Sequence, residues 1–117
     1  MREIKFRAWD EYLKCFYYDG FSISPHGIID PQMQNRYVYS NSPNLLMLEQ
    51  FTGLLDKNGK EIFEGDILQH PTIKDLGPVE WDEYYASFDW LHPKMYGWSM
   101  SDAEIIGNIH ENPELLA

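Results

Sequence analysis

The sequence predicts a mostly β fold: a small antiparallel, barrel-like domain, SH3-like in shape, with an N-terminal hairpin and a short C-terminal helical turn. Three observations carry this prediction. Apolar residues alternate with polar residues over short runs, and turn residues follow each run. The seven prolines and eight glycines are spread along the 117 residues, which favours short strands over long helices. Aromatic residues make up 15% of the chain, so we expect a packed core.

The length favours a single domain over residues 1–117. Within it, residues 1–44 form a candidate β subregion and residues 45–117 a candidate barrel-like subregion. The one cysteine, Cys15, excludes an internal disulfide and is expected to be a buried, inert thiol. No run approaches the roughly 20 apolar residues of a membrane span, and the first residues resemble a strand rather than a signal peptide. We therefore expect a cytoplasmic protein.

The N-terminal hairpin is predicted from two strand-like runs around a turn. Residues 3–9 alternate with a period of two, as a half-buried strand does. A turn beginning at Asp10 leads to a second strand over residues 14–18. In this strand Ile4, Phe6 and Ala8 fall on one face, and Glu3, Lys5, Arg7 and Trp9 fall on the other.

The region that follows is harder to predict. Residues 21–44 are rich in proline, glycine and serine, which interrupt any regular pattern, although residues 28–29 and 37–39 each suit a short strand. Residues 47–52 are predicted as a strand because a turn-rich segment follows at once. A helix is the alternative there, since Asn44 suits a cap and leucine favours helices.

Residues 50–68 predict a β-meander. Its first turn fits two registers. In a two-residue Asn58-Gly59 loop, Asp56 would face Glu61, and like charges directly opposite each other are unfavourable. In a type I turn with a bulge, Asp56 caps the turn and faces Lys60, while Gly59 takes a left-handed φ. We predict the bulged register.

A second turn starts the third strand of the meander. Gly65 is expected at its turn position, and Asp66 is expected to accept backbone hydrogen bonds where the next strand begins. Farther along, we predict strands over residues 79–81, 84–90, 94–100 and 104–110, with a turn at residues 82–83 between the first two. At the end, Asn112 precedes a proline and a glutamate, which predicts the cap of one helical turn.

Charge is distributed unevenly along the chain. Nine basic and nineteen acidic residues give a formal net charge of −10, and residues 77–117 contain eight acidic residues and one basic residue, Lys94, a balance of −7. A general phosphate-binding surface depends on Lys and Arg, so direct nucleic-acid binding is not expected. An acidic half suits either solubility or a basic partner.

Motifs for catalysis, metal binding and cofactor binding are absent from the sequence. The histidines, His26, His70, His92 and His110, lack metal-ligand spacing and a nucleophile motif. In the central turn, lysines occupy positions where calcium ligands would belong, and the glycines form no phosphate loop. We expect no cofactor, no metal and no enzymatic activity.

Aromatic residues crowd the window 81–98 and exceed what a small core needs. Because strand faces alternate, some of them should be partly exposed. Exposed aromatic residues dominate interface energetics, so we predict a protein-interaction surface or, most simply, self-association into a homo-oligomer. The candidate residues are Trp81, Tyr84, Tyr85, Trp90, Tyr96 and Trp98.

Four separated segments resemble the YopX family of small bacteriophage and prophage proteins. They are residues 5–10, 50–67, 79–81 and 104–115. Phe63 and His110 stand where the family usually has tyrosine. The resemblance implies a viral or prophage origin, a β-rich fold and expression in the bacterial host cytoplasm. It implies no assigned activity.

The leading functional hypothesis is a non-enzymatic phage protein that acts through protein contacts, either with itself or with a host or phage protein. A second hypothesis is an acidic decoy, whose carboxylates imitate DNA phosphates and occupy a host DNA-binding protein. A small hydrolase or metal enzyme is a third.

Overall fold

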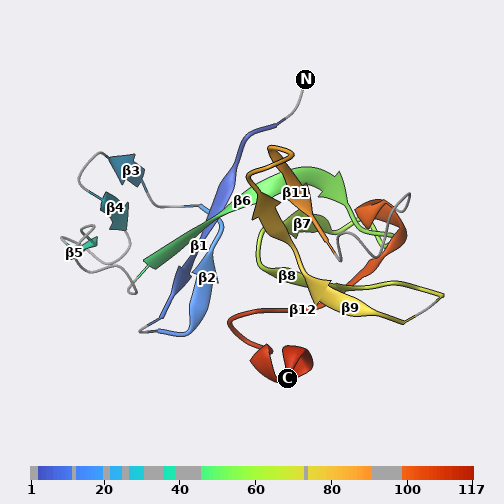
Figure 1. Ribbon diagram of the computed structural model, residues 1–117. Coiled ribbons are helices and arrows are strands. Elements are labelled where there is room, and N and C mark those ends of the chain that lie inside the picture. Colours follow the sequence, from blue (N-terminus) through green and yellow to red (C-terminus); the bar gives the residue numbers. More distant parts are fainter. Residues whose placement is uncertain are drawn as a thin grey trace. The chain divides into compact units, whose positions relative to one another are not determined.

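The computed structural model describes residues 3–11, 13–19, 22–24, 27–30, 36–38, 46–72, 74–90 and 99–117. The chain divides into two compact units (Figure 1), one formed by Phe6–Glu49 and the other by Met1–Lys5 with Gln50–Ala117. The boundary between residues 49 and 50 lies inside one long strand, β6 (Leu46–Leu55). Each unit is built from short antiparallel strands.

The unit Phe6–Glu49 contains a hairpin and a meander. Strands β1 (Phe6–Asp10) and β2 (Cys15–Tyr17) form the predicted N-terminal hairpin, in which Trp9 pairs with Phe16. The meander consists of β3 (Ser22–Ser24), β4 (Gly27–Asp30) and β5 (Arg36–Val38), each antiparallel to the next. The short strands expected at residues 28–29 and 37–39 correspond to β4 and β5, whereas β3 was not expected.

The half-buried alternation expected for the first strand is not found, because residues on both of its faces are buried. Arg7 and Trp9 are 3% and 2% exposed, Ala8 on the opposite face is 0% exposed, and Ile4 is 71% exposed. Arg7 is buried because Glu49 accepts a hydrogen bond from its Nε at 2.9 Å, and because its guanidinium lies 4.2 Å from the centre of the Phe16 ring. For a guanidinium that is paired with a carboxylate and stacked on a ring, these contacts offset much of the free-energy cost of leaving water.

The side chain of Tyr17 in β2 forms a hydrogen bond to β1. The Tyr17 hydroxyl donates a hydrogen bond to Asp10 Oδ2 at 3.1 Å. Burial, together with this carboxylate, raises the pKa of Tyr17 above its ordinary value. Cys15, at the start of β2, is half-buried rather than fully buried.

The unit with the C-terminus holds the remaining strands. After β6 come β7 (Glu61–Phe63), β8 (Asp66–Gln69), β9 (Leu76–Pro78), β10 (Glu80–Asp82), β11 (Ser87–Asp89) and β12 (Glu104–Asn108). Two 3₁₀ helices, η2 (Met100–Asp102) and η3 (Pro113–Leu116), precede and follow β12. β7 pairs with β6, β8 lies between β12 and β9, and β10 and β11 pair with each other. Strand β6 bends beside β7 (Figure 1), and the curled antiparallel sheet has the form of a half-barrel, where the sequence predicts a barrel-like domain.

The core of this unit is a cluster of five buried side chains on several elements. Trp90 is its largest member, and the Trp90 indole Nε1 donates to the backbone oxygen of Leu68 at 3.0 Å. The buried His70 ring stacks on Trp90 with ring centres 6.3 Å apart. The cluster consists of Ile62, Leu68, Val79, Trp90 and Ala103.

The turn between β6 and β7 has the bulged register. Asp56 N donates to the backbone oxygen of Lys60 at 2.8 Å, and Gly59 N donates to the backbone oxygen of Asp56 at 3.0 Å. Gly59 has φ +82° and Gly65, in the next turn, has φ +89°, both in the left-handed region where glycine avoids strain. Asp66 Oδ2 accepts a hydrogen bond from Phe63 N at 2.8 Å, which closes the second turn.

Several predicted strands differ from the structure in extent. Val79 lies between β9 and β10 rather than at the start of a strand, residues 83–86 are a turn, and residues 109–110 are a turn after β12. Of the predicted strand 94–100, residues 94–98 lie outside the described residues, Ser99 is not in a strand and Met100 begins η2. Asn112 precedes η3 as expected, but its side chain makes no capping hydrogen bond and accepts from Asn108 N instead.

The predicted fold class is confirmed: the structure is mostly β and antiparallel, with an N-terminal hairpin and a short C-terminal helical turn. Over the described residues, no helix has both the length and the apolar character needed to cross a membrane.

Candidate interaction surface on the β10–β11 hairpin

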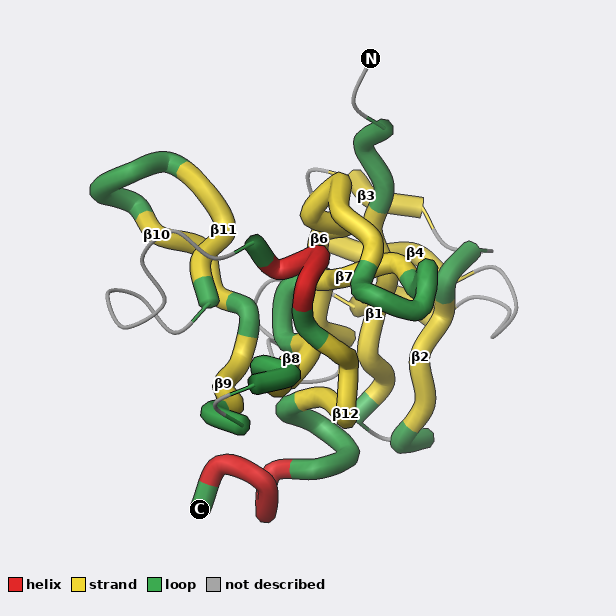
Figure 2. Tube along the Cα trace, turned by 90° about the vertical axis from the view of Figure 1, so that its right-hand side faces the viewer, coloured by secondary structure: helices red, strands yellow, loops and turns green. Residues whose placement is uncertain are grey.

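Strands β10 and β11 form a two-stranded sheet of their own (Figure 2). Glu80 pairs with Asp89, Trp81 with Phe88, and Asp82 with Ser87. The turn is fixed by the Asp82 side chain, whose Oδ1 accepts hydrogen bonds from Tyr84 N at 2.8 Å and Tyr85 N at 3.2 Å. This is the turn chemistry for which aspartate is favoured.

The two faces of the hairpin differ in chemistry. Because side chains alternate along a strand and paired residues share a face, Glu80, Asp82 and Asp89 belong to one face and Trp81 and Phe88 to the other. The Trp81 and Phe88 rings pack edge to face with centres 5.0 Å apart. One face of the hairpin is therefore acidic, and the other carries the packed aromatic pair.

The tip of the hairpin exposes aromatic surface. Tyr84 is 87% exposed, Tyr85 is 59% exposed and Trp81 is 46% exposed. The two tyrosine rings pack edge to face with centres 4.8 Å apart. Large exposed aromatic side chains gathered on one short hairpin are typical of a protein-interaction site.

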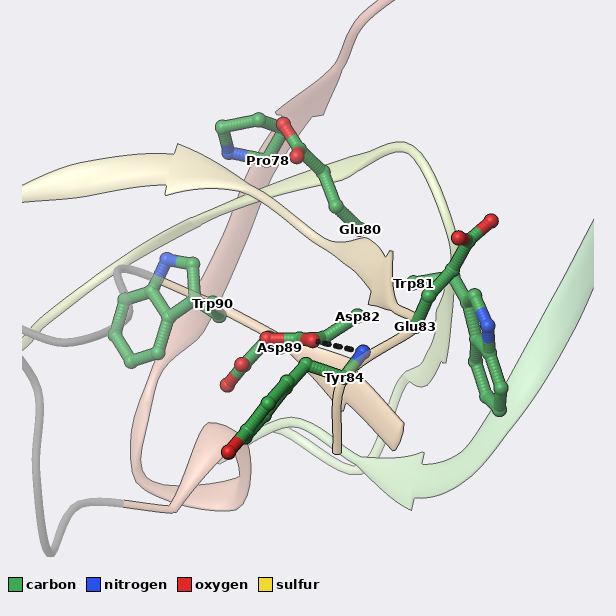
Figure 3. Close-up of a pocket in the computed structure, with 8 residues that line it drawn as sticks. All are labelled: Pro78, Glu80, Trp81, Asp82, Glu83, Tyr84, Asp89 and Trp90. Atoms are coloured by element: carbon green, nitrogen blue, oxygen red, sulfur yellow. Dashed lines mark hydrogen bonds between the residues drawn. The ribbon is translucent and has the colours of Figure 1, made fainter. Parts of the chain in front are cut away.

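A hollow of about 590 Å³ lies against this hairpin (Figure 3). Figure 3 shows the Asp89 carboxylate pointing into the space between the Trp90 and Tyr84 rings, with Trp81 and Glu83 on the other side of the hairpin. The hollow combines four carboxylates with three aromatic rings. Its lining residues are Pro78, Glu80, Trp81, Asp82, Glu83, Tyr84, Asp89 and Trp90.

Four of the six aromatic residues predicted for an interaction surface therefore lie at this hairpin. Trp81, Tyr84 and Tyr85 are exposed, but Trp90 is 5% exposed and belongs to the core, so it contributes only a wall of the hollow. Tyr96 and Trp98 lie outside the described residues.

The acidic residues of the hollow include a like-charge pair. Glu80 and Asp89 are directly opposite each other on β10 and β11, an arrangement that destabilises a sheet. The sequence contains no lysine or arginine between Lys74 and Lys94. Glu80 and Glu83 form no ion pair within the described part of the chain. The hairpin thus concentrates negative charge beside aromatic rings.

The predicted turn residues Asp56, Asn58, Gly59, Gly65 and Asp66 have a structural role in the protein. Asp56 is 5% exposed, and its carboxylate accepts hydrogen bonds from three backbone N–H groups. Burial raises the pKa of Asp56, but the hydrogen bonds from Ile105, Lys60 and Asn58 outweigh burial, so this pKa lies below its ordinary value. Asn58 Nδ2 donates to Glu104 Oε2 at 3.1 Å.

Neither of the two histidines in the described residues, His70 and His110, lines the hollow. His70 is fully buried, and its Nδ1 accepts a hydrogen bond from Thr72 N at 3.1 Å. His26 and His92 lie outside the described residues. In the ranges that the structure describes, no group of three His, Cys, Asp or Glu side chains is close enough to hold a metal ion.

Sequence reasoning missed the carboxylates that line the hollow as individual residues: Glu80, Asp82, Glu83 and Asp89. The excess of acidic residues after residue 76 and the aromatic residues of the window 81–98 were both evident from the sequence. The missing information was the strand pairing, since Glu80 and Asp89 are brought together only by the turn at residues 83–86.

A comparison with protein families identifies one family for the chain. The family described as "YopX protein" matches residues 5–117. Among solved structures, the crystal structure of protein EF1440 from Enterococcus faecalis is similar, with a TM-score of 0.68, 30% sequence identity, and coverage of 100% of each chain. A comparison with curated proteins found no match.

Proposed function

The chain belongs to the YopX protein family, and from this premise we propose that it is a non-enzymatic protein-interaction domain whose β10–β11 hairpin binds a basic protein partner. The observation that supports the proposal is the composition of this hairpin. It combines exposed Trp81, Tyr84 and Tyr85 with the acidic lining of the hollow. Aromatic side chains provide contact area at an interface, and complementary charge directs the choice of partner.

The partner we propose is a protein other than a second copy of this chain. The hairpin surface is acidic and the whole chain has a net charge of −10, so two copies meeting at this face would place carboxylates against carboxylates. Such like-charge contacts oppose association. Self-association into a homo-oligomer is the second form of the proposal, and it would have to use another surface.

The biological setting we propose is a bacteriophage or prophage, with the protein present in the cytoplasm of its bacterial host. The resemblance to YopX proteins supports this setting. The partner is then a host or phage protein with exposed arginine or lysine residues.

A decoy function is a second candidate, because a host DNA-binding protein also presents basic residues. In that case the carboxylates act as substitutes for phosphates, and binding depends mainly on exposed charge contacts. Such contacts are screened at molar salt. Binding through the aromatic residues would persist there, so salt dependence separates the two functions.

The test is a capture experiment with three immobilised forms of the protein. These are the wild type, a double variant with Tyr84→Ser and Tyr85→Ser, and a control with Tyr18→Ser. Tyr18 is 59% exposed, as Tyr85 is, but it lies outside the hairpin. We expect the wild type and the Tyr18→Ser control to retain the same host or phage protein, and the double variant to lose it.

Equal capture by all three forms would contradict the proposal, since the hairpin would then not be the contact surface. A stable homo-oligomer that survives Tyr84→Ser and Tyr85→Ser, with no other protein retained, would contradict binding of a partner by the hairpin and favour self-association through another surface. Circular dichroism of each variant verifies that it remains folded.

A further inference from the structure

The β6–β7 turn contains an asparagine followed by a glycine, Asn58-Gly59, and both residues are exposed. In such a pair the backbone nitrogen of the glycine can attack the side-chain amide carbon of the asparagine, because glycine has no side chain to hinder the approach. Asparagine is for this reason one of the residues that limit the lifetime of proteins at high temperature. The turn thus carries a reactive pair of groups that water can reach.

The other asparagines of the chain are less suited to this reaction. Every one of them precedes a residue with a side chain. Asn112 precedes Pro113, whose nitrogen carries no proton to lose. Asn108 is 9% exposed and precedes the β-branched Ile109. Asn58 is therefore the position where attack meets the least hindrance.

The space beside the attacking nitrogen is open. A Cβ atom added to Gly59 would meet no other atom within 4 Å. A ring that closes between the Asn58 side chain and the Gly59 nitrogen therefore meets no obstacle on the glycine side of the turn.

The fold holds both reacting groups in hydrogen bonds. Gly59 N, the attacking atom, donates to the backbone oxygen of Asp56 at 3.0 Å. Asn58 Nδ2, the leaving nitrogen, donates to Oε2 of the half-buried Glu104 in β12 at 3.1 Å. A hydrogen bond to a carboxylate is stronger than one between neutral groups. Attack therefore requires the turn to open and the Asn58 amide to leave Glu104.

We propose that Asn58 is the site at which this protein deamidates spontaneously, and that Glu104 slows the reaction by holding the Asn58 amide. The Gly59 nitrogen loses its proton and forms a bond to Cγ of Asn58, and the bond from Cγ to Nδ2 breaks. Nδ2 takes up the proton and leaves as ammonia, so a succinimide remains. Water then opens the ring at either carbonyl, which gives aspartate or isoaspartate at position 58.

Either product turns an attractive contact into a repulsive one. A carboxylate then stands at position 58, where the amide donated to Glu104, and two carboxylates this close repel each other. Isoaspartate also lengthens the main chain by a methylene group, which the hydrogen bond between Gly59 N and Asp56 cannot accommodate without distortion. Deamidation therefore weakens the attachment of the turn to β12. The site does not depend on the proposed function of the β10–β11 hairpin.

The first measurement is peptide mapping by mass spectrometry of the wild-type protein stored at neutral pH. Cleavage after glutamate releases residues 50–61 as one peptide, with Asn58 as its only asparagine. We expect this peptide to deamidate before any other, with both aspartate and isoaspartate present, because the succinimide opens at either carbonyl. In urea, where the two protecting hydrogen bonds are lost, the reaction should be about tenfold faster.

The second measurement tests Glu104. Glu104→Ala removes the acceptor of the Asn58 amide, so deamidation of the folded protein should accelerate about three- to tenfold. Glu104→Gln retains an acceptor oxygen and should remain closer to the wild type. The matched control is Glu114→Ala, which removes an exposed carboxylate in η3 and should change the rate by less than about twofold. In urea all these forms should react at the same rate.

The third measurement imitates one product directly. Asn58→Asp should lower the melting temperature by about 2–5 °C, and by less in a protein that also carries Glu104→Gln, because the repulsion is then absent. Asn58→Ser, which loses the amide without adding a charge, is the control and should be the more stable of the two single variants.

Three results would overturn the proposal. One is deamidation of another asparagine while Asn58 stays intact. A second is formation of aspartate without isoaspartate, since direct hydrolysis of the side chain does not pass through the succinimide. The third is equal rates for Glu104→Ala and Glu114→Ala in the folded protein, which would remove the protecting role of Glu104.

Discussion

The Asp56 carboxylate accepts a hydrogen bond from the backbone N–H of Ile105 at 3.0 Å, across 49 residues of sequence. The other carboxylate oxygen of Asp56 accepts from the N–H groups of Asn58 and Lys60 at 2.8 and 2.9 Å. One side chain therefore shapes the β6–β7 turn and fixes it to the start of β12. A second link runs in parallel, since Lys57 N donates to the backbone oxygen of Ala103 at 2.9 Å.

The first prediction concerns the loss of the Asp56 carboxylate. Asp56→Ala leaves three backbone N–H groups without their acceptor, and it should lower the free energy of unfolding by about 2–4 kcal/mol. Urea denaturation measures this change. The matched control is Asp75→Ala, because Asp75 is exposed and its side chain lacks such bonds in the described structure; its effect should stay within about 0.5 kcal/mol. Equal effects of the two variants would contradict a structural role for Asp56.

The second prediction is the pH dependence that follows from the lowered pKa of Asp56. The stability that this carboxylate contributes is complete above its ordinary pKa of 3.8. It is lost as the pH falls through the lower value of the folded state, because the unfolded chain then binds the proton more readily. The difference in unfolding free energy between the wild type and Asp56→Asn should therefore be largest near neutral pH and shrink below about pH 4. A difference that does not change between pH 7 and pH 3 would show that the charge of Asp56 is not responsible.

The third prediction concerns Gly59 in the bulged turn. Gly59 has φ +82°, and a Cβ atom added there would meet no other atom within 4 Å. The cost of Gly59→Ala is therefore backbone strain alone, about 1 kcal/mol. Gly59→Asn should cost less, because asparagine tolerates the left-handed region better than alanine does. Thermal melting of both variants provides the comparison, and an Asn variant less stable than the Ala variant would argue against strain as the cause.

The central turn could be predicted from sequence because its determinants are local. The choice between the two registers depended on which charges face each other across the turn, and Asp56, Gly59 and Lys60 lie within five consecutive positions. The antiparallel fold class was predictable for the same reason: short alternating runs and turn residues act over short distances.

The burial of Arg7 in β1 could not be predicted because its determinant is remote in sequence. Alternation placed Arg7 on the face opposite Ile4, Phe6 and Ala8, and a charged side chain is rarely buried without a partner. The partner is Glu49, which is 42 residues away and enters only when the unit folds. The charge of Arg7 was visible in the sequence, but its neutralisation was not.

The candidate interaction surface has features that the local sequence reveals and others that depend on the fold. The aromatic content of the hairpin was evident from composition, and the exposed Trp81, Tyr84 and Tyr85 were among the predicted residues. A turn was predicted at residues 82–83, but the structure has it at residues 83–86, where Ala86 adopts φ +52° without a glycine to signal it. Without the true bounds of that turn, the opposition of Glu80 and Asp89 could not be foreseen.

The fourth prediction concerns the buried pair of Arg7 and Glu49, which are 3% and 5% exposed. Their direct hydrogen bond is 2.9 Å long. Arg7→Met leaves the Glu49 carboxylate buried without the guanidinium, so the free energy of unfolding should fall by about 3–5 kcal/mol. Replacing both residues, with Arg7→Met and Glu49→Leu, removes both charges, and most of the lost stability should return. An exposed pair provides the control: Glu3 lies 3.4 Å from Lys5, and Glu3→Gln should cost less than about 1 kcal/mol.

Chemical denaturation of the two single variants and the double variant completes a cycle that isolates the interaction between the two charges. If the double variant is less stable than either single variant, the pair is not the unit that matters, and the packing of Arg7 on the Phe16 ring, 4.2 Å away, becomes the main contribution of this arginine. If stability returns, the pair confers little net stability and instead fixes which residues face inward. Glu49 neutralises the charge of Arg7 inside this unit, so the pair favours the arrangement in which β1 meets Glu49 over others that apolar residues alone would permit.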